Sequence, residues 1–365
     1  MIHVKNETVH PKSINNETKK QSLQFENSKN KSFFRWVEGT VTNRQDYLKK
    51  YGKNILIYPI HRTLNMIKTH LNVPLSCTLF LTDKCNFKCI GCSRNVVGVK
   101  HFTEMKLETV QKLLSSYPLL HTFCIAGLGE PTLCSDFVPI VDFLQKKNKY
   151  VVVVTNGTNV DKLLALSNPP NYILISLYGY DNKSYKENTG VGAFSKVMET
   201  YDKARKKFSN IGFSYILKKT NYKDLEKVLA LCDKKKPNFL FLFNYLAYDS
   251  KSTEDVEKII TVNDTEIINY IDELSLNKKY DVTKPTYADF DKPIYACKSY
   301  NYLINLDGEG NIGGCERQLP PDAVFGNILS EKDPFHSSEM NRLRRLQHNN
   351  CFAHKECRFC FGNWK

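Results

Sequence analysis

Short apolar runs alternate with amphipathic stretches between residues 74 and 243 of the chain. The runs are continuous in apolar character, as in strands buried on both faces, and lie at 78–81, 122–126, 150–154, 172–177, 211–216 and 239–243. Apolar residues recur at helical spacing at 107–114, 137–146, 160–166, 194–207 and 222–234. This α/β alternation predicts a partial (β/α)6 barrel with a parallel sheet, whose chemistry lies at the carboxyl ends of the strands.

Outside this region the pattern changes, which predicts further segments. Residues 1–30 are rich in Asn, Lys, Ser, Glu and Thr and predict a disordered tail. Residues 31–73 mix apolar and charged positions, as in a helical N-terminal extension. We expect the barrel over 74–248, a charged helical connector over 249–290, and a small cysteine-rich α+β domain over 291–365, stabilised by metal.

Composition narrows the class of protein. The 365 residues contain no 18-residue apolar run and no secretory signal pattern, so we expect a cytoplasmic protein without a membrane partner. Twelve cysteines in a reducing compartment indicate metal ligands or free thiols rather than disulfides. The net charge of +14 comes from dispersed lysines, which favours a solvated surface. A nucleic-acid partner remains open but is not favoured, because no RNA-binding module is recognisable.

Three cysteines follow the first predicted strand directly. Cys85, Cys89 and Cys92 form a C-x3-C-x2-C pattern, for which chance gives an expectation of roughly 1% in this chain. Three thiolates bind only three irons of a four-iron cubane and leave one iron open. Structural zinc, the alternative, takes four ligands, and no neighbouring Cys or His completes the set.

This pattern resembles the signature of the radical SAM superfamily, which lies on the loop after the first barrel strand. The segment GLGEP at 127–131, at the end of the second predicted strand, is similar to the family's GGEP element. By that resemblance, Gly129 allows close backbone approach and Glu130 pairs with the amino group of S-adenosylmethionine (SAM).

Three further elements follow successive strands in the same order. TNG at 155–157 resembles an element over the SAM site and implies a role for Asn156. SLYG at 176–179 resembles the family's SLDG element and places Ser176 near the ribose or carboxylate, while Asn221 is a weaker candidate after the fifth strand. The chain also departs from the family: Gly91 stands where an aromatic residue is common, Leu128 replaces a Gly, and 188–190 reads NTG in place of an arginine element.

A second group of cysteines lies near the end of the chain. Residues 303–312 have the alternating pattern of a hairpin, which would bring Cys297 and Cys315 together. With GNI at 326–328 and a C-x2-C pair, the segment resembles the twitch form of SPASM domains. That resemblance implies one auxiliary 4Fe-4S cluster, with four cysteine ligands: Cys297, Cys315, Cys357 and Cys360.

Cys351, Cys134 and the metal of the C-terminal cysteine group each have two alternative assignments. Cys351 either replaces one of these four ligands or is a spare thiol. Four-cysteine zinc is the alternative to the auxiliary cluster. Cys134 follows the GLGEP segment by a few residues and is either a packing thiol or a hydrogen-atom donor to a substrate radical.

The resemblance implies a reaction. The reduced cluster on Cys85, Cys89 and Cys92 would bind SAM and cleave it to methionine and a 5′-deoxyadenosyl radical, which abstracts hydrogen from a substrate. An electron donor such as flavodoxin or ferredoxin is implied. We expect a peptide or protein substrate in natural-product maturation; the alternatives are a sugar or aminocyclitol dehydrogenase or epimerase, and a zinc-stabilised RNA-binding protein without catalysis.

Overall fold

The computed structural model describes residues 72–94, 102–247, 253–291, 299–315 and 324–348, all within the unit Lys31–Lys365. The predicted tail over 1–30 and nearly all of the predicted extension over 31–73 lie outside these residues. Within the described residues, no helix is both long and apolar enough to cross a membrane.

A ten-stranded sheet organises the described residues, in the order β10-β9-β8-β1-β2-β3-β4-β5-β6-β7. All pairings from β8 through β1 to β7 are parallel, whereas β8–β9 and β9–β10 are antiparallel. The α/β prediction is confirmed: the sheet is that of a partial barrel with antiparallel strands added at its C-terminal side. The strands are β1 (Ser76–Leu79), β2 (Thr122–Ile125), β3 (Tyr150–Thr155), β4 (Tyr172–Leu177), β5 (Ile211–Leu217), β6 (Phe239–Asn244), β7 (Asp281–Thr283), β8 (Leu303–Leu306), β9 (Asn311–Gly313) and β10 (Gly326–Asn327).

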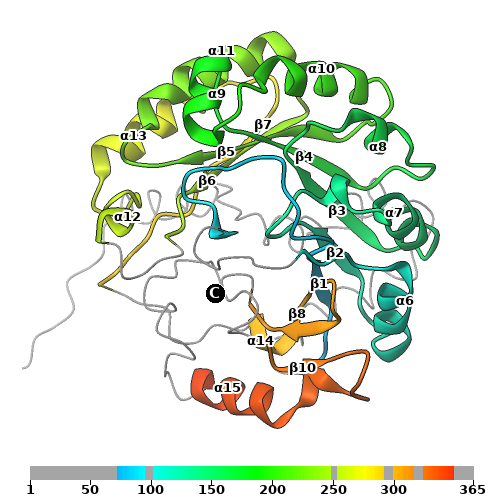
Figure 1. Ribbon diagram of the computed structural model, residues 1–365. Coiled ribbons are helices and arrows are strands. Elements are labelled where there is room, and N and C mark those ends of the chain that lie inside the picture. Colours follow the sequence, from blue (N-terminus) through cyan, green and yellow to red (C-terminus); the bar gives the residue numbers. More distant parts are fainter. Residues whose placement is uncertain (1–71, 95–101, 248–252, 292–298, 316–323, 349–365) are drawn as a thin grey trace, which may run out of the picture. The chain divides into compact units, whose positions relative to one another are not determined.

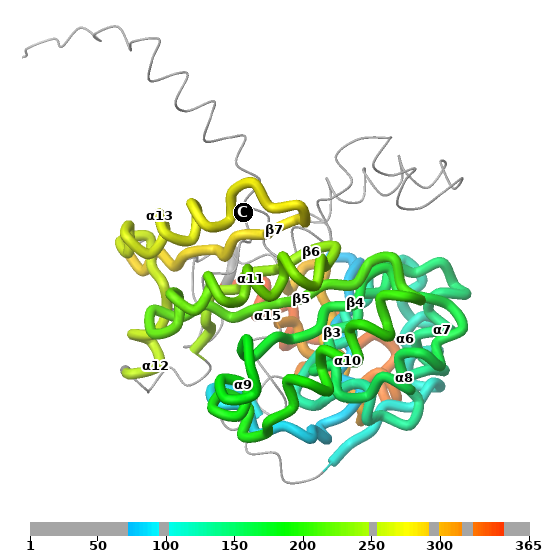
Figure 2. Tube along the Cα trace, turned by 90° about the horizontal axis from the view of Figure 1, so that it is seen from above, coloured from blue at the N-terminus to red at the C-terminus, as the bar shows by residue number. Residues whose placement is uncertain are grey.

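Helices follow the strands in sequence and cover one face of the sheet. In Figure 1, helices α6, α7, α8, α10 and α11 lie along the outer side of the curved strands, and Figure 2 shows the same succession from above. The helices are α6 (Leu107–Ser116), α7 (Phe137–Lys146), α8 (Val160–Leu164), α9 (Asn182–Thr189), α10 (Phe194–Ala204), α11 (Leu225–Lys235), α12 (Thr253–Glu257), α13 (Thr265–Leu274), α14 (Ser299–Tyr302) and α15 (Ser338–His348).

Strand side chains alternate between two apolar clusters, as the period of two requires. Phe123 and Val151 belong to the large core shared with the helices. Cys124, Val152 and Leu174 belong to a smaller cluster formed by strand residues. The sheet is therefore buried on both faces, which explains why its strands read as continuous apolar runs.

The C-terminal segment joins this sheet directly. β8 and β9 form the expected hairpin, and β8 also pairs in parallel with β1, with Thr78 opposite Asn305. The predicted helical connector over 249–290 contains one strand that was not expected. This strand, β7, pairs in parallel with β6. The hairpin prediction is confirmed, and one continuous sheet runs across the expected domain boundaries.

Helix α9 lies between two predicted elements and was not expected. Its residues are mostly polar, so its hydrophobic pattern is weak. Its ends are well defined: Asp181 and Ser184 form a capping box at its start, and Gly190 ends it in the left-handed conformation, with φ of 73°. These local signals fix where the helix begins and ends. Its last residues lie beside the candidate site described below.

Candidate functional site

Cys85, Cys89 and Cys92 lie on residues 82–94, just beyond the carboxyl end of β1; we call this segment the cysteine loop. All three side chains are half-buried. Burial raises the pKa of Cys85 and raises the pKa of Cys89 to about 12, and the Cys92 thiol adds to both shifts. Thiolates at these positions therefore require a compensating cation, such as iron.

The number of these thiols matches a cubane with one open iron, which takes three protein thiolates. One zinc ion needs four ligands gathered around one point. Among the described residues, no group of three or more His, Cys, Asp or Glu side chains is placed to hold a metal ion in that way.

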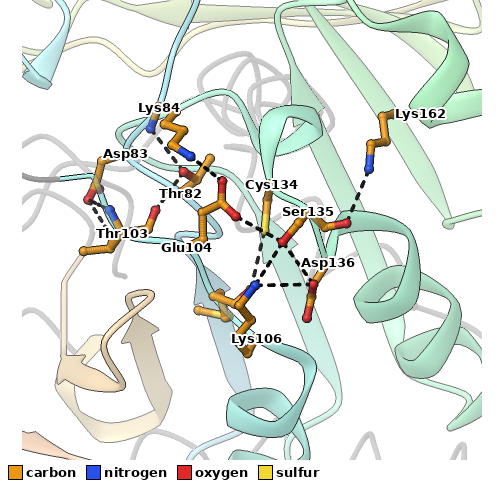
Figure 3. A network of polar contacts seen from close by, with 11 residues as sticks. Thr82, Asp83, Lys84, Thr103, Glu104, Lys106, Cys134, Ser135, Asp136 and Lys162 are labelled. Atoms are coloured by element: carbon orange, nitrogen blue, oxygen red, sulfur yellow. Dashed lines mark hydrogen bonds and ion pairs between the residues drawn. The ribbon is translucent and has the colours of Figure 1, made fainter.

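Polar side chains hold the first residues of the cysteine loop, as Figure 3 shows. The Thr82 hydroxyl donates to the Thr103 carbonyl at 2.8 Å, and Asp83 accepts from the Thr103 hydroxyl at 2.7 Å. The Lys84 ammonium contacts Glu104 at 2.8 Å. These contacts fix the path of the chain between β1 and the first cysteine.

Gly129, after β2, packs directly against the backbone of the cysteine loop. A Cβ atom at this position would lie 2.1 Å from the Thr82 carbonyl oxygen and 2.5 Å from that of Lys84. The next amide, of Glu130, donates to the Lys84 carbonyl at 2.8 Å. Only glycine allows this approach, which places the end of β2 against the segment that leads to Cys85.

Glu130 is 2% exposed and ties the ends of β2 and β3 together. Its carboxylate accepts from the Thr155 hydroxyl and the Asn156 amide, each at 2.6 Å, and from the Thr132 hydroxyl at 2.7 Å and amide at 3.2 Å. Burial raises the pKa of this carboxyl, and these donors oppose the shift. Because the acceptors are used inside the protein, pairing of Glu130 with a SAM ammonium stays a prediction.

Asn156 belongs to a side-chain network that links β3 to the cysteine loop. Its amide nitrogen donates to the Asn86 side-chain oxygen at 2.7 Å, and its own oxygen accepts from the Thr158 hydroxyl at 2.7 Å. Asn86 in turn donates to the Thr158 hydroxyl at 2.8 Å. This closed set of amides and one hydroxyl orients the loop residue next to Cys85.

The NTG segment at 188–190 braces the other end of the loop. The Thr189 carbonyl accepts from the Lys88 amide at 3.0 Å, and the Asn188 carbonyl accepts from the Ile90 amide at 2.9 Å. These two bonds flank Cys89 in the sequence. The end of α9 therefore supports the cysteine loop through backbone carbonyl groups. The side chains of the NTG segment gave no indication of this contact.

Ser176 and Asn221 stand near the ends of neighbouring strands. The Ser176 carbonyl accepts from the Tyr185 hydroxyl at 3.0 Å. The Asn221 side chain accepts from the Lys218 amide at 2.7 Å and donates to the Ile216 carbonyl at 3.1 Å, which closes the turn after β5. Direct contact of Ser176 or Asn221 with SAM stays a prediction.

Tyr245 and Lys218 also lie beside the cysteine loop; the aromatic run 241–245 could be predicted from the sequence to line a cavity, whereas Lys218 could not. Tyr245 follows β6, is 5% exposed, and lies against Gly91: a Cβ there would be 2.8 Å from the Tyr245 hydroxyl oxygen. The Lys218 ammonium lies 4.9 Å from the centre of the Tyr245 ring. The aromatic side chain that follows β6 thus occupies the space beside Gly91.

Cys134 is fully buried within the large core. Its thiol donates to the Met105 carbonyl at 3.5 Å, and burial raises its pKa. The adjacent Ser135 donates to Glu104 at 3.0 Å and so joins the contacts of Figure 3. This environment favours packing over hydrogen-atom donation for Cys134.

Four of the five C-terminal cysteines, Cys297, Cys351, Cys357 and Cys360, lie outside the described residues. Cys315 is described: it follows β9 at the end of the hairpin and is half-buried. Its assignment as a cluster ligand stays a prediction.

Residues 79–232 match the family described as the radical SAM superfamily. Fe-coproporphyrin III synthase of Methanosarcina barkeri is 22% identical over 190 residues, which cover 51% of this chain and 47% of that protein. Mycofactocin maturase MftC of Mycolicibacterium smegmatis is 26% identical over 184 residues, or 48% of this chain and 46% of that protein. The chain thus spans about half the length of the curated relatives it matches.

Solved structures share the fold at low sequence identity. SuiB of Streptococcus suis, bound to precursor peptide SuiA, has a TM-score of 0.60 at 14% identity, covering 95% of this chain and 83% of that chain. anSMEcpe with bound AdoMet has a TM-score of 0.59 at 21% identity, covering 79% and 86%. These likenesses show the architecture of the sheet and its C-terminal strands.

Proposed function

We propose that this chain, whose residues 79–232 match the radical SAM superfamily, is a radical SAM enzyme. It would reductively cleave SAM and use the 5′-deoxyadenosyl radical to abstract hydrogen from a peptide or protein. The cysteine loop is the observation that carries the proposal. Cys85, Cys89 and Cys92 would hold a 4Fe-4S cluster, which supplies an open iron for SAM and the electron that cleaves the sulfonium.

The surrounding residues would orient SAM and the loop. Gly129 brings the end of β2 within backbone contact of the loop, and the Asn86–Asn156 hydrogen bond of 2.7 Å joins the end of β3 to it. Ser176 lies in β4, next in the sheet, where the cofactor would extend beyond the cluster. Glu130 and Asn221 would support this edge mainly through their internal hydrogen bonds.

A peptide substrate is supported by the proteins that this chain resembles. MftC is named a maturase, and the SuiB and anSMEcpe structures include complexes with peptides. A small-molecule substrate is the second candidate, since GTP 3',8-cyclase of Haemophilus influenzae is also 26% identical over half of this chain. The proposed electron donor is a low-potential protein such as flavodoxin or ferredoxin.

Substrate-dependent cleavage of SAM tests the substrate class. Anaerobically reconstituted enzyme, SAM and dithionite are combined with each short peptide encoded beside the gene, or with sugars and aminocyclitols. We expect one peptide to raise 5′-deoxyadenosine formation several-fold above the substrate-free rate. A deuterated form of that peptide should transfer deuterium to 5′-deoxyadenosine, as mass spectrometry detects. Stimulation and deuterium transfer by a sugar or aminocyclitol alone would contradict the peptide assignment.

Iron content tests the proposed auxiliary cluster on Cys297, Cys315, Cys357 and Cys360. Two cubanes predict about eight irons per chain, and Cys315→Ala should reduce this to about four. Cys232→Ala, a buried thiol in α11, is the matched control and should retain the full content. About four irons together with one zinc in the unmodified protein would identify a zinc site and refute the auxiliary cluster.

A further inference from the structure

Asn305, in β8, carries a buried carboxamide that makes no hydrogen bond within the part of the chain that the structure describes. The residue is 3% exposed, and both its amide nitrogen and its amide oxygen lack a partner there. Buried polar side chains are nearly always hydrogen-bonded, because an unpaired polar group is costly where the dielectric constant is low. The exception at Asn305 therefore points to a group that binds to this amide.

Asn244, at the end of β6, shows how a buried asparagine is normally accommodated in this sheet. It is 8% exposed. Its side-chain nitrogen donates to the Ile260 carbonyl at 2.7 Å and to the Thr286 carbonyl at 3.0 Å, and its oxygen accepts from the Ile260 amide at 3.1 Å. Burial of an asparagine in this protein is thus compatible with a full set of hydrogen bonds, which Asn305 lacks.

The strand neighbours of Asn305 show which face of the sheet its side chain is on. Ile304 and Leu306 belong to the large core shared with the helices, so Asn305, which lies between them, faces the opposite side. Asn305 is in register with Thr78 of β1, and Thr78 is in register with Cys124 of β2. Cys124 belongs to the cluster formed by strand residues. Asn305 therefore points toward the inner side of the curved sheet in Figure 1, away from the outer helices.

This inner face is less completely covered toward the carboxyl ends of the strands. Ala126, just after β2, and Val154 and Phe243, near the ends of β3 and β6, pack on the same strand cluster but are only partly buried. The cysteine loop begins beyond the same edge of the sheet. Asn305 is the last residue but one of β8, so its amide lies close to the edge at which a substrate would meet the cysteine loop.

The chemistry around Asn305 favours a neutral polar ligand. The residues in register with it across the next three strands, Thr78, Cys124 and Val152, carry no charge, so a carboxylate or phosphate would find no compensating cation in this row. A carboxamide has a donor and an acceptor side by side, and a peptide group offers the complementary pair.

We propose that Asn305 is a substrate-binding residue, whose amide hydrogen-bonds a backbone peptide group of the substrate through both its nitrogen and its oxygen. The inference rests on the proposed function, because it takes the substrate to be a peptide. It adds a residue of β8, outside the cysteine loop and the motifs at the strand ends, to the residues that select the substrate.

The first test is Asn305→Leu in the reconstituted full-length protein, a change of similar size that removes both polar atoms. The probes are the short peptides encoded beside the gene, titrated while 5′-deoxyadenosine is measured. We expect half-maximal stimulation to require about tenfold more peptide, because two neutral hydrogen bonds are lost. SAM cleavage without peptide and the SAM-responsive signal in electron paramagnetic resonance (EPR) should be unchanged.

The thermal midpoint without peptide separates substrate binding from a structural role. Asn305→Leu should raise the midpoint by a few degrees, because an apolar group replaces an unpaired buried amide. Asn244→Leu is the matched control: the same change at another buried strand residue should lower the midpoint, because it leaves backbone groups of Ile260 and Thr286 unpaired.

Equal stimulation of the unmodified and Asn305→Leu proteins by the same peptide concentrations would overturn the inference. A lower midpoint in Asn305→Leu, or a failure of this variant to fold, would also overturn it, because the amide would then be hydrogen-bonded in the folded protein, for example to internal water. If no peptide stimulates the unmodified enzyme, the peptide substrate of the proposed function is contradicted instead. The two failures are thus distinguishable.

Discussion

Replacing Cys85, Cys89 and Cys92 together by Ala should abolish the SAM-responsive iron-sulfur signal and reduce 5′-deoxyadenosine formation to background. Each thiolate supplies one corner of the proposed cubane, and no nearby side chain of the cysteine loop can replace three thiolates. Because the three residues are half-buried on a loop outside the sheet, the fold should persist. EPR with and without SAM, and chromatography of the reaction products, measure the two effects.

The control for this variant is Cys134→Ala, which removes a buried thiol close in sequence to GLGEP. It should retain the SAM-responsive signal and SAM cleavage, with a modest loss of stability from the small cavity. Circular dichroism of both proteins checks that each is folded. Cleavage of SAM by the triple variant would refute the assignment of the cysteine loop as the active site.

Gly129→Ala should displace the cysteine loop and strongly reduce cluster loading and SAM binding. The added Cβ would meet two backbone carbonyl oxygens, of Thr82 and Lys84, which cannot rotate away as a flexible side chain could. Overpacking of this kind costs on the order of 1–3 kcal/mol of folding free energy. Iron content, SAM affinity by calorimetry and the thermal midpoint report the three consequences.

Gly192→Ala provides the matched comparison, because a Cβ at Gly192 would meet nothing within 4 Å. That variant should retain the cluster, SAM binding and the thermal midpoint of the unmodified protein. Normal cluster loading and normal SAM affinity in Gly129→Ala would mean that the contact between the end of β2 and the loop is not required.

The strands of the barrel could be predicted from the sequence because they are buried on both faces. β2, β3 and β4 begin at the expected residues, and β1 begins two residues before the expected start. Helix α9 was missed because its buried residues, Ser184, Tyr185 and Thr189, are too few and too polar to give an apolar period. Its capping residues, Asp181 and Gly190, were the available signal.

Part of the candidate site could likewise be predicted from the sequence, and part of it could not. The cysteine spacing is local, so the sequence alone locates the loop. The contacts that hold this loop are long-range: the Lys88 amide bonds to the Thr189 carbonyl, about a hundred positions away. Motif residues such as Glu130 and Asn156 were correctly located at strand ends, but a motif does not specify where a side chain points, and both use their polar atoms within the protein.

The parallel pairing of β1 with β8 also bears on how the protein is made. Ser76 lies opposite Leu303, more than two hundred positions later, so one side of the first strand has no partner until most of the polypeptide has left the ribosome. At ~5–20 residues per second this interval lasts roughly 11–45 s. During that time the nascent chain presents an open strand edge next to three reactive thiols, a stage at which chaperones would protect it from aggregation.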